Sequence, residues 1–334
     1  MQAQEHDAAP QTPVPVARAV MAGVLMGMAN LVPGISGGTM LVACGVYRRF
    51  IDAVSDFSRL RPSKQAGLLL ALIVAGAASA IAGCAGLIHW ALVEHRWVMY
   101  SLFIGLTLGG APILWRMARP LRADVMAGLV VGAAVMALMV YLQETGAGGA
   151  GLSGPGWLVF GGVAGASAMI LPGISGAFLL LLLGQYETII GSVKSAVAAL
   201  SRADLGALMA EMWVIVPVGI GVLLGIAAVS NVLKWVMHRY ERPTIGVLLG
   251  LLVAAPAGLY PFREGVPPAV GDTIKGRLVT EDNVEEFRSP DQSKDWAQRA
   301  YRPDPGEIAA CLGLIGVGFG ATVLISRLGR DRPA

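Results

Sequence analysis

The chain has 334 residues, of which 55% are hydrophobic and only 14% charged, and its formal net charge is +3. Globular chains carry charge on roughly a quarter of their residues. Here the apolar residues gather in long uncharged runs, and a membrane-crossing helix needs about 20 such residues. The composition therefore excludes a soluble enzyme, a nucleic-acid-binding protein and a largely disordered chain, and it predicts an all-α polytopic membrane protein.

The uncharged runs give the predicted membrane segments in chain order. They lie at residues 19–47, 65–93, 97–115, 125–143, 212–233, 243–262 and 308–326. A polar tail, residues 1–16, comes first and lacks the basic start and apolar core of a cleaved signal peptide, so we expect the first run to be retained. The three cysteines lie singly inside runs, which predicts no disulfide framework, metal site or other cofactor.

The strongest internal signal is a repeat at an offset of 139 residues. Segments 29–51 and 168–190 share ten identities over 23 positions, and both contain Pro-Gly-Ile-Ser-Gly. This predicts two homologous membrane repeats. The predicted divisions are a tail at 1–16, a first repeat at 17–143, a glycine-rich linker at 144–154, a second repeat at 155–327 with a polar extracytoplasmic insert at 263–307, and a C-terminal tail at 328–334.

Each Pro-Gly-Ile-Ser-Gly motif is followed by a short apolar stretch. From Gly37 to Tyr47, and again from Gly176 to Tyr186, there are 11 uncharged residues. A helix of that length rises about 16 Å, half of a hydrocarbon core about 30 Å thick. We therefore expect a re-entrant helical hairpin in each half, with its tip at mid-membrane; two full helices joined by a tight turn are the alternative.

The distribution of Lys and Arg predicts the orientation. If each hairpin returns to its own side, 15 basic residues lie on one side, 3 lie in short loops on the other, and 7 lie in the polar insert. Short cytoplasmic loops hold the excess of basic residues, so both termini should be cytoplasmic. Three full crossings per half would place the second repeat upside down relative to the first. The expected fold is thus two inverted repeats, each a re-entrant hairpin plus three transmembrane helices.

The two motifs predict a central binding site. Non-helical backbone is tolerated at membrane depth only where it is buried in protein or lines a wet cavity. Proline ends the incoming helix, glycines permit close approach, and the free N–H groups at the start of the outgoing helix attract a phosphate or carboxylate. Transporters with inverted halves use such broken helices. The candidate substrate-binding residues are Asn30, Pro33, Gly34, Ser36, Gly37, Gly38, Thr39, Pro172, Gly173, Ser175 and Gly176.

The two predicted tips differ chemically. Asn30, which either contacts a ligand or caps the broken helix, corresponds to the apolar Met169. The ends of the short helices hold the candidate coupling or gating residues, which are Tyr47, Arg48, Tyr186 and Glu187. A tyrosine there is otherwise an interface anchor, and Glu187 is either a proton-relay group or a solvated helix end.

The motifs also resemble a known family. Asn-Leu-Val-Pro-Gly-Ile-Ser-Gly-Gly-Thr-Met (30–40) and Met-Ile-Leu-Pro-Gly-Ile-Ser-Gly (169–176) resemble the paired signatures of the bacterial polyprenyl-phosphate translocase family, long catalogued as a domain of unknown function. The resemblance implies a multi-pass protein of the bacterial cytoplasmic (inner) membrane that recycles undecaprenyl phosphate for cell-envelope synthesis, with that lipid as its partner. The acidic residue at the end of the family motif is present as Glu187 but is Arg48 in the first half.

Two other functions fit parts of the pattern. A channel or exchanger for small anions would use the same helix N-termini. A phosphatase acting on undecaprenyl diphosphate shares a Pro-Gly-x-Ser element, but such enzymes carry an arginine directly after the serine and a pair of glutamates, whereas Gly37 and Gly176 follow the serines here. The sequence therefore favours a non-enzymatic translocase. The tips contain no cation, so Arg48 or another arginine at a hairpin base is the candidate partner for a phosphate.

Overall fold

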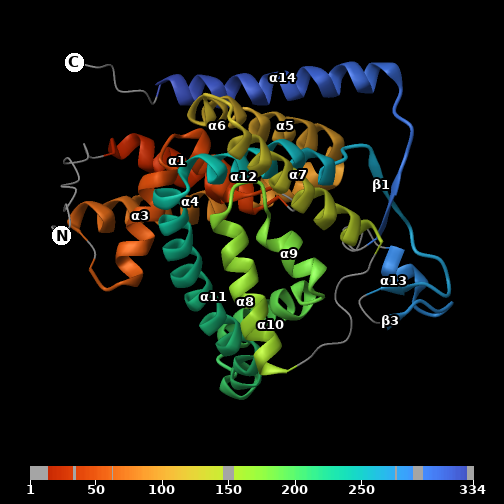
Figure 1. Cartoon of the computed structure of the whole chain (residues 1–334). Helices are drawn as coiled ribbons and strands as arrows, with labels where there is room; N and C mark the ends of the chain where they lie inside the picture. Colours follow the sequence, from red (N-terminus) through yellow and green to blue (C-terminus); the bar gives the residue numbers. More distant parts are fainter. Residues whose placement is uncertain are drawn as a thin grey trace.

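The computed structural model describes residues 14–32, 35–61, 63–145, 154–274, 277–288 and 296–328. Over these residues the chain is mostly helical (Figure 1). Five helical segments are long and apolar enough to cross a membrane, at 64–84, 96–118, 123–142, 205–239 and 305–327. The chain is therefore a multi-pass helical membrane protein, as its composition predicts.

The first half contains seven helices among the described residues. They are α1 (Val16–Asn30), α2 (Gly37–Ala43), α3 (Tyr47–Ser58), α4 (Lys64–Glu94), α5 (Arg96–Leu108), α6 (Ala111–Ala118) and α7 (Ala123–Glu144). The second half repeats this order with α8 (Pro155–Ile170), α9 (Gly176–Leu182), α10 (Tyr186–Ser201), α11 (Leu205–Arg239), α12 (Glu241–Ala254), the 3₁₀ turn η1 (Ala255–Gly258) and α14 (Pro305–Leu328). In both halves a long helix, α4 or α11, follows the short helices.

The short helices after the motifs are shorter than the expected 11 residues. Both α2 and α9 have seven residues, and the second residue after each helix is a glycine, Gly45 or Gly184, with φ of +68°. Glycine adopts this left-handed conformation at no steric cost, so the chain turns there and a new helix begins at the following tyrosine. The axes of α9 and α10 are bent by 115° at this turn.

The run at 243–262 also departs from its prediction as a simple crossing. Its α-helix, α12, ends at Ala254, and the chain continues as η1, which contains Pro256, because proline lacks the N–H group that an α-helix would use. With Leu248, Leu249 and Leu252 at most 2% exposed, α12 is a central element rather than a lipid-facing one.

Helix pairs pack in the same way in the two halves. In the first half α1 packs against α4, and in the second α8 packs against α11. Across the halves, α5 of the first packs against α14 of the second, and α12 of the second packs against α7 of the first. Small residues allow these close approaches: a Cβ atom on Gly23 of α1 would lie 2.2 Å from the Ile73 carbonyl oxygen of α4. Because each half contributes a helix that packs on the other half, the two halves are interlocked. Figure 1 shows α14 alongside α5 and α6.

The polar insert folds as a small subdomain with strands, which the all-α prediction did not include. Strand β1 (Arg263–Val266) pairs antiparallel with β4 (Ala297–Ala300), and β2 (Thr273–Ile274) pairs with β3 (Arg277–Leu278). A short helix, α13 (Val284–Arg288), completes it. Three residues form its buried core, Ile274, Val279 and Phe287. In Figure 1 the insert lies at the opposite end of the molecule from the beginning of α1 and the end of α14. The predicted linker at 144–154 lies mostly outside the described residues.

Candidate functional site

The two Pro-Gly-Ile-Ser-Gly breaks lie against each other. The hydroxyl of Ser36 donates a hydrogen bond of 2.8 Å to the carbonyl oxygen of Leu171. The backbone N–H of Gly173 donates one of 3.0 Å to the hydroxyl oxygen of Thr39. Ser36 is 3% exposed and Thr39 is fully buried. Residues more than 130 positions apart in sequence thus form one buried polar contact between the halves.

Two glycines are required by the close packing around the breaks. A Cβ atom on Gly38 would lie 2.8 Å from the carbonyl oxygen of Ile170, which is backbone and cannot rotate away. Gly173 has φ of +90°, and a Cβ atom there would lie 2.8 Å from the carbonyl carbon of Leu251 in α12. The first break therefore packs on the second, and the second packs on α12. This packing accounts for both glycines without a ligand.

The two serines occupy equivalent positions but bond differently. Ser36 and Ser175 are the N-cap residues of α2 and α9, both with extended backbone. The Ser175 hydroxyl accepts a hydrogen bond of 3.5 Å from the Phe178 N–H. Ser36 makes no such cap bond, because its hydroxyl reaches the other break. The two described hydrogen bonds between the breaks thus use the side chains of Ser36 and Thr39 and the backbone of Leu171 and Gly173.

The other candidate binding residues lie around this contact. Asn30 is the last residue of α1 and is exposed, and a Cβ atom on Gly37 would lie 3.1 Å from its amide oxygen. Pro172 is buried, and a Cβ atom on Gly176 would lie 2.9 Å from the carbonyl oxygen of Gly165. The remaining two candidates, Pro33 and Gly34, lie outside the described residues.

The four coupling or gating candidates have different surroundings. Tyr47 is only 5% exposed, and its hydroxyl donates a hydrogen bond of 3.0 Å to the carbonyl oxygen of Ile170, so it joins the halves rather than anchoring an interface. Arg48 is exposed and forms an ion pair with Glu241 at the start of α12. Tyr186 is half-buried and Glu187 is exposed at the start of α10.

A further hydroxyl near the breaks was missed by the sequence analysis. Thr107 of α5 is 2% exposed, and its hydroxyl has no hydrogen-bond partner within the described part of the chain. Gly105 and Gly109, two residues to either side, both face α14. At 100° per residue Thr107 lies on the opposite face, the one from which Phe103 and Ile104 pack against the first break. A single threonine in an apolar run gives no sequence signal for this position.

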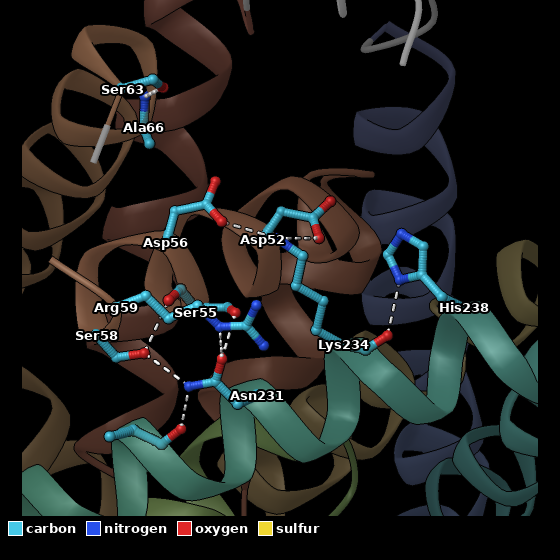
Figure 2. Close-up of polar contacts among 11 residues, drawn as sticks. Asp52, Ser55, Asp56, Ser58, Arg59, Ser63, Ala66, Asn231, Lys234 and His238 are labelled. Atoms are coloured by element: carbon cyan, nitrogen blue, oxygen red, sulfur yellow. Dashed lines mark hydrogen bonds and ion pairs between the residues drawn. The ribbon is translucent and has the colours of Figure 1, made fainter. Parts of the chain in front are cut away.

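A second polar region joins α3 to α11, and Figure 2 shows it. We call it the α3–α11 cluster; its members are Asp52, Ser55, Asp56, Ser58, Arg59, Asn231 and Lys234. The ammonium group of Lys234 lies 2.8 Å from Asp56 and 3.6 Å from Asp52. The amide of Asn231 accepts from Ser55 and from Arg59, and it donates to Ser58. In the sequence, Asp52 and Asp56 are visible only as two carboxylates four residues apart on an amphipathic segment. The sequence does not indicate that their partner is α11.

The described residues contain no group of three or more His, Cys, Asp or Glu side chains placed to hold a metal ion. The arrangement at the breaks consists of buried hydroxyl and backbone groups, which can donate hydrogen bonds to an oxygen-rich ligand.

Comparison with known proteins assigns the chain to a family. A model of the undecaprenyl phosphate translocase-like family matches residues 26–270, which include both breaks and the α3–α11 cluster. The chain belongs to this family. Its relatives include a polyprenyl-phosphate transporter of Vibrio cholerae serotype O1, 28% identical over 265 residues that cover 72% of this chain and 77% of the relative. A polyprenyl-phosphate transporter of Staphylococcus aureus is 28% identical over 250 residues, covering 72% of this chain and 85% of that relative. No solved structure matches the chain.

Proposed function

We propose that this protein is a flippase-type translocase that moves undecaprenyl phosphate across the bacterial cytoplasmic membrane, so that the carrier lipid is recycled in cell-envelope synthesis. The observation that carries the proposal is the buried contact between the two breaks, where hydroxyl groups of Ser36 and Thr39 meet the backbone of Leu171 and Gly173. Membership of a translocase-like family supports the same substrate.

The headgroup binds by replacing contacts that the breaks make with each other. A neutral hydrogen bond contributes about 0.5–1.5 kcal/mol, whereas one to a charged group contributes about 1.5–3 kcal/mol. A phosphate oxygen is therefore a better partner for the Ser36 hydroxyl than the Leu171 carbonyl is. Thr107 adds a buried hydroxyl on the helix face that packs against the first break. The prenyl chain stays in lipid while the charged group crosses through protein.

The proposed mechanism is alternating access between inverted repeats. In each half the short helix after the break contacts the helix before it, α2 with α1 and α9 with α8, and the halves pack on each other through α5 with α14 and α12 with α7. In the proposed cycle, each half moves as a unit with the helix of the other half that packs on it, and the breaks stay between the moving parts. With both termini cytoplasmic, the hairpins enter from opposite faces of the membrane.

The principal alternative is a channel or exchanger for small anions, because hydroxyl and N–H groups at the breaks serve a free anion equally well. A phosphatase remains the weaker alternative. Residues 29–47 and 168–186 contain no Lys, Arg, Asp or Glu, so neither break supplies the general base or charged clamp that phosphoryl transfer needs.

The proposal is tested by transbilayer movement of undecaprenyl phosphate in proteoliposomes. The wild-type protein is compared with a Ser36→Ala, Ser175→Ala double variant whose folding has been checked by gel filtration. We expect the wild type to move the lipid and the double variant to lose most of that movement. Competition between inorganic phosphate and the lipid distinguishes the translocase from an anion channel. For a translocase, inorganic phosphate at a concentration equal to that of the lipid should not inhibit lipid movement.

Two results would change the assignment. If the double variant still moves the lipid, the translocase function stands, but the headgroup binds at residues other than Ser36 and Ser175. A folded wild type that moves no lipid phosphate, with or without an ion gradient, refutes the translocase and makes anion flux and lipid diphosphate hydrolysis the activities to measure.

A further inference from the structure

A phosphate headgroup entering the membrane needs a positive partner, and the breaks provide none. Residues 29–47 and 168–186 contain no Lys or Arg. Arg48, the basic residue next to the first break, is paired with Glu241 on an exposed surface. Because an unpaired charge inside a bilayer is costly, the headgroup needs a cation where it leaves the aqueous phase.

A cavity beside the α3–α11 cluster has the chemistry of such a receiving site. Its volume is about 440 Å³, and it lies between α1, α3, the beginning of α4 and the end of α11. The polar part of its lining includes Arg49, Lys234 and His238 together with the carboxylates of Asp52 and Asp56, and the α4 wall contributes Leu68, Leu69 and Leu72. An amphipathic lining of this kind matches a ligand with an anionic head and a branched apolar tail, rather than a free ion.

The ammonium group of Lys234 is the cation placed to change partners. It extends from α11 toward α3 (Figure 2), where it lies 2.8 Å from Asp56 and 3.6 Å from Asp52. The Lys234 side chain is 24% exposed, and those of Asp52 and Asp56 are 28% and 40% exposed. These ion pairs are partly solvated, so they are readily exchanged for another anion. His238 contacts the Lys234 carbonyl oxygen through Nδ1 at 2.7 Å and leaves the ammonium group to the carboxylates.

We propose that Lys234 receives the phosphate of the lipid substrate in this cavity, and that the phosphate replaces Asp52 and Asp56 as its partner. The inference rests on the proposed function and adds to it the residue that meets the headgroup at the face predicted to be cytoplasmic. Loss of the two ion pairs weakens the attachment of α3 to α11, which belong to different halves. Arrival of the headgroup is thereby linked to separation of the halves on that face.

The second half has no equivalent of this cluster. At the repeat offset of 139 residues, Asp52 corresponds to Gly191 and Asp56 to Ser195. In the described structure α10 does not pack against α4 as α3 packs against α11. The replacement of Asp52 and Asp56 by a phosphate at Lys234 is therefore confined to one face, and the opposite face opens and closes without it.

Binding of radiolabelled undecaprenyl phosphate to the purified full-length protein tests the exchange. Three variants are compared: Lys234→Gln, an Asp52→Asn, Asp56→Asn double variant, and Lys194→Gln, which removes an exposed lysine on α10 as a charge-matched control. We expect Lys234→Gln to weaken binding about tenfold, as loss of a charge-assisted hydrogen bond implies. The double variant should bind several-fold more tightly because it removes the competing carboxylates, and Lys194→Gln should bind as the wild type does.

The expected changes in lipid affinity are opposite for Lys234→Gln and for the aspartate double variant. This difference distinguishes replacement of the carboxylates by phosphate from a purely structural contact. If the cluster only holds helices together, Lys234→Gln and the double variant change binding in the same direction, and the proposal is wrong. Lys234→Arg keeps the charge and should restore binding to within a few-fold, which guards against misfolding of the glutamine variant. Inorganic phosphate that displaces the lipid at equal concentration would show a site for free phosphate and overturn the lipid assignment.

Translocation by the wild type, measured in parallel, separates this proposal from the proposed function. A wild type that moves the lipid, together with a Lys234→Gln variant that binds it normally, refutes the role of Lys234 alone. A wild type that neither binds nor moves the lipid refutes the translocase itself.

Discussion

Substitution of Gly38 by alanine tests whether the contact between the breaks holds the two halves together. The new Cβ atom would lie 2.8 Å from the carbonyl oxygen of Ile170, whereas ordinary contacts begin at 3.4 Å. Neither side of this contact is a flexible side chain, so the breaks must separate by about 0.6 Å at a cost of roughly 1–3 kcal/mol. The same shift lengthens the bond between Ser36 and Leu171, which adds about 1 kcal/mol. The free energy of unfolding should fall by about 2–4 kcal/mol.

The matched control is Gly83→Ala in α4, because a Cβ atom there has no neighbour within 4 Å. Alanine is a better helix former than glycine, so this variant should be more stable by about 0.5–1 kcal/mol. Thermal unfolding in detergent and lipid translocation in proteoliposomes are measured for both variants. Gly38→Ala should unfold at a lower temperature and lose most transport. If it equals Gly83→Ala in both assays, the close contact between the breaks does not exist in the membrane.

Two further substitutions test individual side chains. Thr107→Val keeps the side-chain volume and removes a hydroxyl that has no partner in the described structure. We expect the free energy of unfolding to stay the same or rise slightly, and transport to weaken at low lipid concentration. Transport equal to that of the wild type would mean that the hydroxyl does not meet the headgroup. Glu187→Gln should reduce the response of transport to an imposed pH gradient if this exposed carboxylate relays protons, and an unchanged response would remove it as a coupling group.

Much of the local structure could be predicted from the sequence because it depends on local chemistry. Runs of apolar residues predicted the long helices, and Pro-Gly-Ile-Ser-Gly predicted the interruptions that precede α2 and α9. The shorter length of α2 and α9 could also have been expected, because Gly45 and Gly184 precede the tyrosines at which the next helices begin. The positions of these turns depend on glycine conformation, which an apolar count ignores.

Lateral packing could not be predicted in the same way. The sequence gives no reason for Thr39 to accept a hydrogen bond from Gly173, or for Lys234 to meet Asp56, because each pair joins helices far apart in the chain. The strands of the insert were missed because they are short and pair across intervening segments, as β1 does with β4. Such contacts follow from the arrangement of whole helices and segments rather than from a local pattern.

The repeat in the sequence does not make the two halves equivalent. Thr39, whose hydroxyl bonds to the second break, corresponds to Phe178, which can form no such bond. Tyr47 is buried and bonds to Ile170, whereas its counterpart Tyr186 is only half-buried. The two described hydrogen bonds between the breaks join the side chains of Ser36 and Thr39 to the backbone of the second break, so substitution of either side chain removes its bond directly. The described asymmetry between the two halves therefore lies in the contacts of Thr39 and Tyr47 and in the α3–α11 cluster.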